Sequence, residues 1–155
     1  PQRTILEKLL LRQALQTKLK TVILQGKPEE IKPEEINNVK LIPHLNDERF
    51  SALMQSAKYI ISRPGYSTLM DLAVTGCNAI FIPTPGQTEQ EYLATNMMEN
   101  SIAYSHKQNN FELTDAIKNQ KEYKGFSIKN DSQLLEKRII NLLNICYNKY
   151  SANRS

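Results

Sequence analysis

The residues best suited to chemistry lie in two short polar runs, of which the first is residues 63–68. This run combines Arg63 and Gly65 with the hydroxyl groups of Ser67 and Thr68. Glycine lets a ligand approach the backbone closely, and the amides and hydroxyls at a helix start bind phosphate well. A guanidinium can add a bidentate phosphate contact. The run therefore favours a phosphate or diphosphate site, although a Ser-Thr pair also serves as a plain helix cap.

Side chains that could bind sugar hydroxyls follow the first run and end the second run, residues 83–91. Asp71 is expected in the first turn of the next helix, where its carboxylate could accept hydrogen bonds from a ribose. Glu89, Gln90 and Glu91 offer two carboxylates and an amide that could pair with neighbouring hydroxyls. Both sets also fit ordinary helix starts, because acidic side chains favour the helix dipole there.

Other chemistries find little support in the sequence. No cluster of His, Cys, Asp or Glu has metal-ligand spacing, and neither a P-loop nor a nucleophile elbow is present. His44 and His106 are interpreted as lone surface residues of loops. Cys77 and Cys146 are interpreted as buried thiols of a reducing compartment, because two cysteines are too few for a disulfide framework. No residue is assigned as a catalytic base.

Apolar periodicity and turn residues predict helices and strands that alternate along the chain. The expected helices cover residues 2–19, 49–57, 68–75, 88–99, 114–119 and 132–147, and the expected strands cover 21–24, 39–42, 59–62, 79–83 and 102–104. A tandem repeat at 27–36 is expected to be an exposed loop, because prolines and like charges oppose regular structure. The alternation predicts an α/β fold with a doubly wound, parallel, Rossmann-like sheet covered by helices on both faces. Ligands of such sheets bind at the carboxyl ends of the strands, where both polar runs stand.

The sequence is interpreted as one domain, residues 1–155, that belongs to a longer protein. Its 155 residues are 40% hydrophobic and 23% charged, which suits a single core. The pattern opens on a helix, so the first strand of the sheet and the loop after it are expected to be missing. The net charge of +4 arises in residues 101–155, where scattered lysines give nucleic-acid binding little support. No apolar run has the length of a membrane span.

Two stretches of the sequence resemble one known family. Residues 61–73 read Ile-Ser-Arg-Pro-Gly-Tyr-Ser-Thr-Leu-Met-Asp-Leu-Ala, and Ile82-Pro83 precedes Glu-Gln-Glu-Tyr-Leu-Ala at residues 89–94. Together they resemble the C-terminal domain of the two-Rossmann-domain (GT-B) glycosyltransferases of family 28. That family includes the enzyme that adds N-acetylglucosamine to the peptidoglycan lipid intermediate. The resemblance extends over nearly the whole chain and is most specific between Val39 and Asn96.

The resemblance implies the donor-binding domain of a metal-independent, inverting glycosyltransferase, which transfers a sugar from a UDP-sugar to an acceptor hydroxyl. No cofactor is implied besides this donor substrate. By this resemblance, the diphosphate would lie on the turn after a strand, formed by Gly65, Ser67 and Thr68 together with Arg63. The ribose would be bound by Asp71, where the family usually has glutamate, and the backbone of Leu45 would pair with uracil. The paired polar residues that bind the donor sugar would be Glu89, Gln90 and Glu91.

The resemblance also implies partners and a cellular place. The acceptor site and the catalytic base would belong to an N-terminal domain, so the isolated chain is expected to bind nucleotide but to turn over poorly. The expected place is the cytoplasm, in bacterial cell-envelope glycan synthesis, with the basic C-terminal tail close to the membrane. Three alternatives stay open: a donor-binding subunit that needs a separate membrane-anchored partner, a sugar-nucleotide epimerase-like domain, and a nucleotide-responsive regulatory module.

Overall fold

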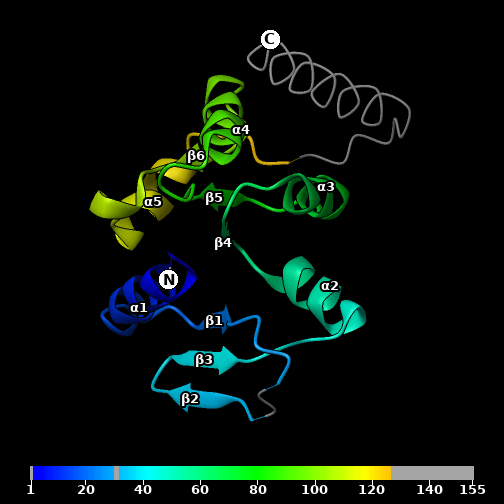
Figure 1. Cartoon of the computed structure of the whole chain (residues 1–155), viewed down its shortest axis with the longest axis vertical. Helices are drawn as coiled ribbons and strands as arrows, with labels where there is room; N and C mark the ends of the chain where they lie inside the picture. The colour runs from blue at the N-terminus through cyan, green and yellow to red at the C-terminus, as the bar shows by residue number, and fades with distance from the viewer. Residues whose placement is uncertain (1, 30–31, 127–155) are drawn as a thin grey trace.

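A computed structural model describes residues 2–29 and 32–126 of the chain, and Figure 1 shows how its elements are arranged. The helices are α1 (Gln2–Leu15), α2 (Asp47–Ser56), α3 (Tyr66–Thr75), α4 (Thr88–Glu99) and α5 (Leu113–Gln120), with a 3-10 helix η1 (Gln108–Asn110). The strands are β1 (Thr21–Leu24), β2 (Glu34–Ile36), β3 (Val39–Ile42), β4 (Ile60–Ser62), β5 (Ala79–Phe81) and β6 (Tyr104–Ser105). The helix expected over residues 132–147, and Cys146 within it, lie outside the described residues.

The six strands form two three-stranded sheets. In sheet A the order is β1-β3-β2, with β1 parallel to β3 and β2 antiparallel to it. In sheet B the order is β4-β5-β6, and all three strands are parallel. In sheet B, α3 joins β4 to its parallel neighbour β5, and α4 joins β5 to β6, which confirms the predicted Rossmann-like α/β class.

The tandem repeat ends in a strand that the sequence did not predict. The expectation of a loop over residues 27–36 is wrong at Glu34–Ile36, which form β2 and make sheet A mixed and not wholly parallel. Asn37, with a left-handed φ of 54°, turns the chain into β3, and asparagine tolerates this conformation better than most residues. All three β2 residues are exposed. The strand therefore forms by backbone pairing with β3, without the alternating burial that a sequence pattern reveals.

Several element boundaries also differ from the predictions. α3 begins at Tyr66, two residues before its expected start, because Gly65 takes the N-cap position. α2 begins at Asp47, two residues before its expected start, because the Asn46 side chain accepts the Arg49 amide at 3.1 Å and so caps the helix there. α1 is four residues shorter than expected, β5 ends two residues early, and β6 lies later than its predicted span.

Helices cover both faces of sheet B, and α1 extends one of these layers to sheet A (Figure 1). One apolar cluster lies beneath α1 and α5, and it takes Ile23 and Leu41 from sheet A and Ile80 from sheet B. A second cluster lies on the other face of sheet B, where α3 contributes Leu72. Cys77 belongs to this second cluster and is 8% exposed, which confirms the predicted burial of this thiol. Helices on both faces confirm the double winding.

A buried glutamine fixes α1 to the segment that leads into α5. Gln13 Nε2 donates to the Phe111 carbonyl oxygen at 2.7 Å, and Gln13 Oε1 accepts the Leu113 amide at 2.8 Å. Gln13 itself is 6% exposed. Both ends of the amide are thus satisfied inside the apolar layer, which is the condition under which a polar side chain can be buried without loss of stability.

Candidate functional site

The carboxyl ends of both sheets lie at one edge of the molecule, because the start of α1 contacts both of them. Arg3 Nη1 donates to the carbonyl oxygen of Gly26, just beyond β1, at 2.9 Å. The Arg63 guanidinium, just beyond β4, donates from Nη2 to the Gln2 carbonyl oxygen at 3.3 Å. The loops that follow β3, β4 and β5 therefore open at this carboxyl edge, where parallel sheets bind their ligands.

The turn between β4 and α3 presents a helix start without a side-chain cap. Gly65 is the N-cap residue, with extended φ and ψ of −126° and 157°, and no side chain caps the helix. Ser67 and Thr68 stand in the first turn of α3, and Ser67 is exposed. Backbone amides at such a helix start have no partner within the helix and carry partial positive charge. This end of α3 is therefore suited to an anion.

The space above Gly65 is open. A Cβ atom placed on Gly65 would meet no other atom within 4 Å, apart from its immediate chain neighbours. The extended backbone at this position suits any residue, so the conformation alone does not require glycine. The feature that a glycine provides here is room for a ligand to reach the backbone.

Asp71 lies in the second turn of α3 and not in the first, because the helix begins at Tyr66. Its side chain is exposed. The expectation of a first-turn capping role for Asp71 is therefore wrong, since α3 has no acidic residue in its first turn. An exposed carboxylate that no cap requires is available to accept hydrogen bonds from hydroxyl groups of a ligand.

Arg63 joins four segments of the carboxyl edge through its guanidinium. Nη1 donates to the carbonyl oxygens of Ile82 at 2.8 Å and Pro83 at 2.9 Å, just beyond β5. Nη2 donates to Gln108 Oε1 in η1 and to the Gln2 carbonyl oxygen in α1. Partial burial lowers the pKa of Arg63 below its usual value. These contacts hold the start of the second polar run in place.

Gln108 is a residue of this edge that the sequence analysis did not find. It is 6% exposed, and its Nε2 donates to Gln2 Oε1 at 3.3 Å while its Oε1 accepts from Arg63. It lies 45 residues beyond Arg63 along the chain, in a polar segment without periodicity. No local signal in the sequence links residues at such a distance.

The second polar run forms a loop that its own side chains close. Gln90 Oε1 accepts the Thr84 amide at 2.8 Å, and Glu91 Oε1 accepts the Gly86 amide at 3.2 Å. Glu89 is exposed at the start of α4. Two of the three polar residues that were predicted to face a donor sugar are thus hydrogen-bonded to the loop backbone. They give residues 84–91 a defined shape at the carboxyl edge.

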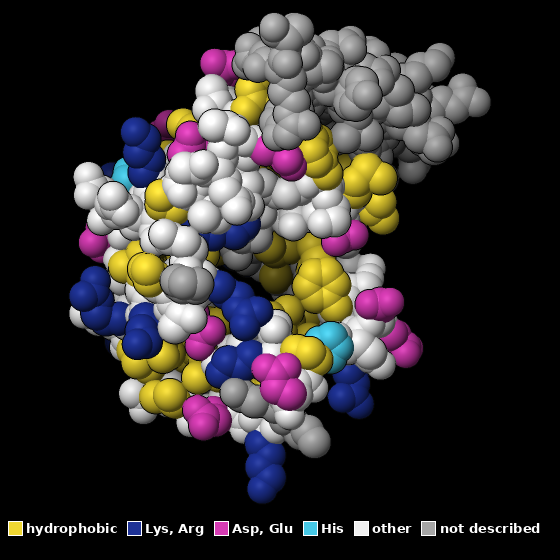
Figure 2. Space-filling view, viewed as in Figure 1, with side chains coloured by type: hydrophobic (Ala, Val, Ile, Leu, Met, Phe, Trp, Pro, Cys, Tyr) yellow, Lys and Arg dark blue, Asp and Glu magenta, His cyan; other side chains and the backbone are white. Residues whose placement is uncertain are grey.

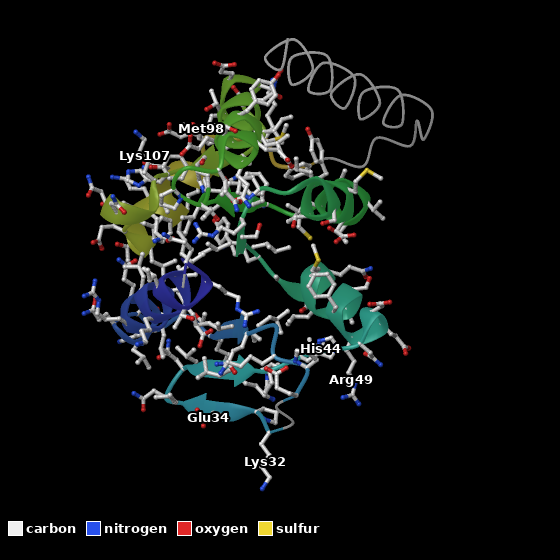
Figure 3. All side chains as sticks on the ribbon, in the orientation of Figure 1. Lys32, Glu34, His44, Arg49, Met98 and Lys107 are labelled. Carbon is white, nitrogen blue, oxygen red and sulfur yellow. The ribbon has the colours of Figure 1, made fainter. Side chains whose placement is uncertain are left out.

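The loop between β3 and α2 completes the edge. Leu45 is half-buried and precedes the helix cap Asn46, while His44 is exposed beside the start of α2 (Figure 3). This confirms the surface position that was predicted for His44. His106, which was also predicted at the surface, is instead half-buried, with its ring centroid 6.2 Å from that of Tyr104.

The structure thus brings most of the predicted site residues to one edge, on loops after β3, β4 and β5. Among residues 2–29 and 32–126, no group of three or more His, Cys, Asp or Glu side chains could hold a metal ion. Within the same part of the chain, no helix is long and apolar enough to cross a membrane. The groups that this edge presents to a ligand are backbone amides, hydroxyls and carboxylates.

The comparison with protein families agrees with this geometry. Residues 3–143 match the family described as the glycosyltransferase family 28 C-terminal domain. The match covers most of the chain, and the chain belongs to this family, whose name assigns it to the glycosyltransferases. No curated protein and no solved structure matched the chain.

Proposed function

We propose that the chain is the donor-binding domain of an inverting glycosyltransferase that takes its sugar from a UDP-sugar without a metal ion. The observation that carries this proposal is the start of α3, which has no side-chain cap and lies beneath the open space over Gly65. Membership of the family supports the class of reaction. The choice of UDP rests on the resemblance of residues 61–73 and 89–94 to family 28 enzymes.

In the proposed complex, the diphosphate lies against the first turn of α3. The backbone amides near Ser67 and Thr68 point out of the helix start, and the dipole adds about half a positive charge there. A leaving UDP gains negative charge as its bond to the sugar breaks, so preorganised donors at this position stabilise the transition state. Arg63 acts in this scheme through its neighbours, because its guanidinium is bound to the carbonyl oxygens of Ile82 and Pro83.

The remaining donor groups are placed around this diphosphate position. Asp71, exposed one turn further along α3, accepts the ribose hydroxyls, and the Leu45 backbone pairs with uracil. Glu89 is the exposed carboxylate nearest the start of α4 and binds a hydroxyl of the donor sugar. Gln90 and Glu91 shape the loop that contacts the same sugar, since each already holds an amide of that loop.

Sugar transfer needs a second domain in this proposal. The acceptor hydroxyl attacks the anomeric carbon from the face opposite UDP, the bond from that carbon to the UDP oxygen breaks, and the hydroxyl proton passes to a base. Attack from the opposite face inverts the configuration at that carbon. An N-terminal acceptor domain supplies the hydroxyl and the base, so the isolated chain binds donor without rapid turnover.

Calorimetric titration of the chain with UDP, GDP and ADP tests the proposal. We expect UDP to bind, and GDP and ADP to bind at least about tenfold more weakly, which corresponds to about 1.4 kcal/mol. Asp71→Ala should weaken UDP binding by a similar factor, because two ribose hydroxyls lose their acceptor. Glu99→Ala, which removes an exposed carboxylate at the far end of α4, is the matched control and should leave the affinity unchanged.

Two results would contradict the proposal. Equal affinities for UDP, GDP and ADP would contradict the proposal that the loop at Leu45 recognises uracil. Equal loss of affinity in Asp71→Ala and Glu99→Ala would show that the effect of Asp71 is one of overall charge and not of a ribose contact. Circular dichroism of each variant separates either result from a failure to fold.

A further inference from the structure

Gln108 is a buried side chain that links three segments of the carboxyl edge. It stands in η1, the short helix that follows β6, and it is 6% exposed. Its Oε1 accepts from Arg63 Nη2, just beyond β4, and its Nε2 donates to Gln2 Oε1 of α1 at 3.3 Å. Because a buried polar atom that loses its partner is costly, these two contacts determine the orientation of the Gln108 amide.

The contact with Gln108 also determines the direction of the Arg63 guanidinium. Nη2 donates to Gln108 Oε1 and to the Gln2 carbonyl oxygen. Nη1 donates to the carbonyl oxygens of Ile82 and Pro83. The four N–H bonds of these two nitrogens therefore match four acceptors. Because a guanidinium is planar and rigid, an acceptor that holds Nη2 also fixes where Nη1 points.

Arg63 continues the link between β4 and the next segment at the point where their backbone pairing ends. The Ile82 amide, one residue beyond β5, donates to the Ser62 carbonyl oxygen at 3.0 Å. The next residue is Pro83, which has no amide hydrogen and cannot donate to a neighbouring strand. Its carbonyl oxygen accepts from Arg63 at 2.9 Å instead. The place where the chain leaves the sheet therefore depends on the Arg63 side chain.

Residues 84–91, called the donor loop from here on, begin at this place. Two contacts give the loop its shape, from the Thr84 amide to Gln90 Oε1 at 2.8 Å and from the Gly86 amide to Glu91 Oε1 at 3.2 Å. Both contacts lie within the loop and the start of α4, so they do not join it to the sheet. The bond from Arg63 to the preceding carbonyl oxygen makes that connection, and Gln108 holds Arg63 from its other side.

We propose that Gln108 is a positioning residue for the donor sugar, because it orients Arg63 and thereby places the donor loop. This inference rests on the proposed function, in which the donor loop contacts the sugar and α3 binds the diphosphate and ribose. The turn at Gly65 is held by backbone bonds, since the Gly65 carbonyl oxygen accepts the Leu69 amide at 2.9 Å. Gln108 therefore governs the affinity for the sugar part of a nucleotide sugar and leaves the affinity for UDP unchanged.

Two substitutions at this position separate the acceptor from the bulk of the side chain. Gln108→Met keeps the length of the side chain and removes both polar contacts. Gln108→Glu keeps an acceptor oxygen for Arg63, and the exposed Gln2 amide can turn to donate to the new carboxylate. The charge of Arg63 compensates this carboxylate, and Figure 2 shows further Lys and Arg side chains around a hollow near the level of β4.

Gln120→Met is the matched control, because it also removes a buried glutamine. Gln120 is 1% exposed, and its Oε1 accepts the Tyr104 amide at 2.6 Å. Tyr104 is the first residue of β6, so this contact lies at the amino end of the strand and away from the carboxyl edge. The control variant therefore loses a buried hydrogen bond without a change in the contacts of Arg63.

Amide hydrogen exchange followed by NMR tests the position of the donor loop without any ligand. We expect the Thr84 and Gly86 amides to exchange at least about tenfold faster in Gln108→Met than in the unchanged chain. Gln108→Glu should restore their exchange to within about threefold of the unchanged chain, and Gln120→Met should leave it unaltered. The Ile60 amide, which donates to the Asn78 carbonyl oxygen at 2.9 Å, reports whether each variant is folded.

Calorimetric titration tests the effect on donor binding. The probes are UDP and either UDP-glucose or UDP-N-acetylglucosamine, whichever of the two sugars the unchanged chain binds more tightly. Gln108→Met should weaken binding of the nucleotide sugar at least about tenfold and binding of UDP less than about twofold. Gln108→Glu should keep most of the affinity for the nucleotide sugar, and Gln120→Met should keep both affinities.

Three results would overturn the proposal. Equal acceleration of Thr84 exchange in Gln108→Met and Gln120→Met would show that the effect is one of general stability. Failure of Gln108→Glu to restore protection would show that an acceptor for Arg63 does not place the loop. Equal loss of affinity for UDP and for the nucleotide sugar in Gln108→Met would show that Gln108 does not act on the sugar part. A chain that binds no nucleotide would contradict the proposed function, and exchange at Thr84 would still decide whether Gln108 holds the loop.

Discussion

Gly65 is the residue on which the proposed donor site depends most directly. Its backbone is extended, and a Cβ atom there would meet nothing, so folding does not require a glycine. Gly65→Ala should therefore change the free energy of unfolding by less than about 1 kcal/mol, the range typical of an N-cap change between these residues. The added methyl group would occupy the space assigned to the diphosphate, so UDP affinity should fall at least about tenfold. Chemical denaturation and calorimetry measure the two effects.

Gly76, at the other end of α3, is the control for that prediction. Its φ of 68° is left-handed, and its amide caps the helix by donating to the Leu72 carbonyl oxygen. Gly76→Ala should therefore lower stability by about 1 kcal/mol with no change in UDP affinity of the folded protein. The opposite pattern for the two variants, in which Gly76→Ala weakens UDP binding and Gly65→Ala does not, would remove the donor site from this turn.

The hydrogen-bond partners of Arg63 could not be predicted from the sequence. The sequence predicted a phosphate contact, since an arginine beside a glycine turn has the right charge. The structure gives its guanidinium the carbonyl oxygens of Ile82 and Pro83, which are both buried. These oxygens stand about 20 residues further along the chain and belong to a neighbouring strand. The sequence alone does not contain that pairing, which arises only when β4 and β5 are side by side.

The stability of an Arg63 variant tests this structural role. Arg63→Met keeps much of the apolar stem and removes the donors, so two buried carbonyl oxygens lose their partners. We expect the free energy of unfolding to fall by about 2–4 kcal/mol in urea denaturation. Arg49→Met, at an exposed position of α2, should change it by less than about 0.5 kcal/mol. An equal, small effect at both positions would show that the Arg63 contacts contribute nothing to folding.

At the scale of elements, burial determines which predictions succeed. β1, β3 and α4 have their predicted bounds. Their apolar side chains alternate or recur with the period of the element, and nearby Gly or Pro residues indicate where each element begins or ends. β2 was missed since its residues are all exposed and its pairing with β3 uses backbone groups alone. The order of strands in each sheet was beyond prediction, because it depends on contacts between segments that lie far apart in the chain.

The attachment of α1 to α5 gives a prediction at this scale. Gln13 satisfies the Phe111 carbonyl and the Leu113 amide from inside the apolar layer. Gln13→Ala leaves both groups buried without a partner, so the free energy of unfolding should fall by about 2–4 kcal/mol. Gln16→Ala removes the same side chain from an exposed position just beyond α1 and should be nearly neutral. Equal melting temperatures of the two variants would contradict this account of how α1 is held.

At the scale of the whole molecule, one edge carries the proposed chemistry and the core holds that edge in place. Loops after β3, β4 and β5 carry the predicted site residues, and the α1 layer joins the two sheets that position them. The class of fold was predictable, because alternating helices and strands allow few arrangements. The division of the described strands into two sheets was not predicted, because strand pairing depends on contacts between segments that lie far apart in the chain.

The most direct test of the central claim is a nitrogen-15 NMR titration of the chain with UDP, which reports each backbone amide separately. The donor-site account predicts that the largest shifts fall on the amides of Gly65, Ser67 and Thr68, with smaller shifts at Asp71 and Leu45. It also predicts that GDP and ADP at the same concentration produce markedly smaller changes. Shifts centred on another part of the molecule, or none at any of these amides at millimolar UDP, would contradict it.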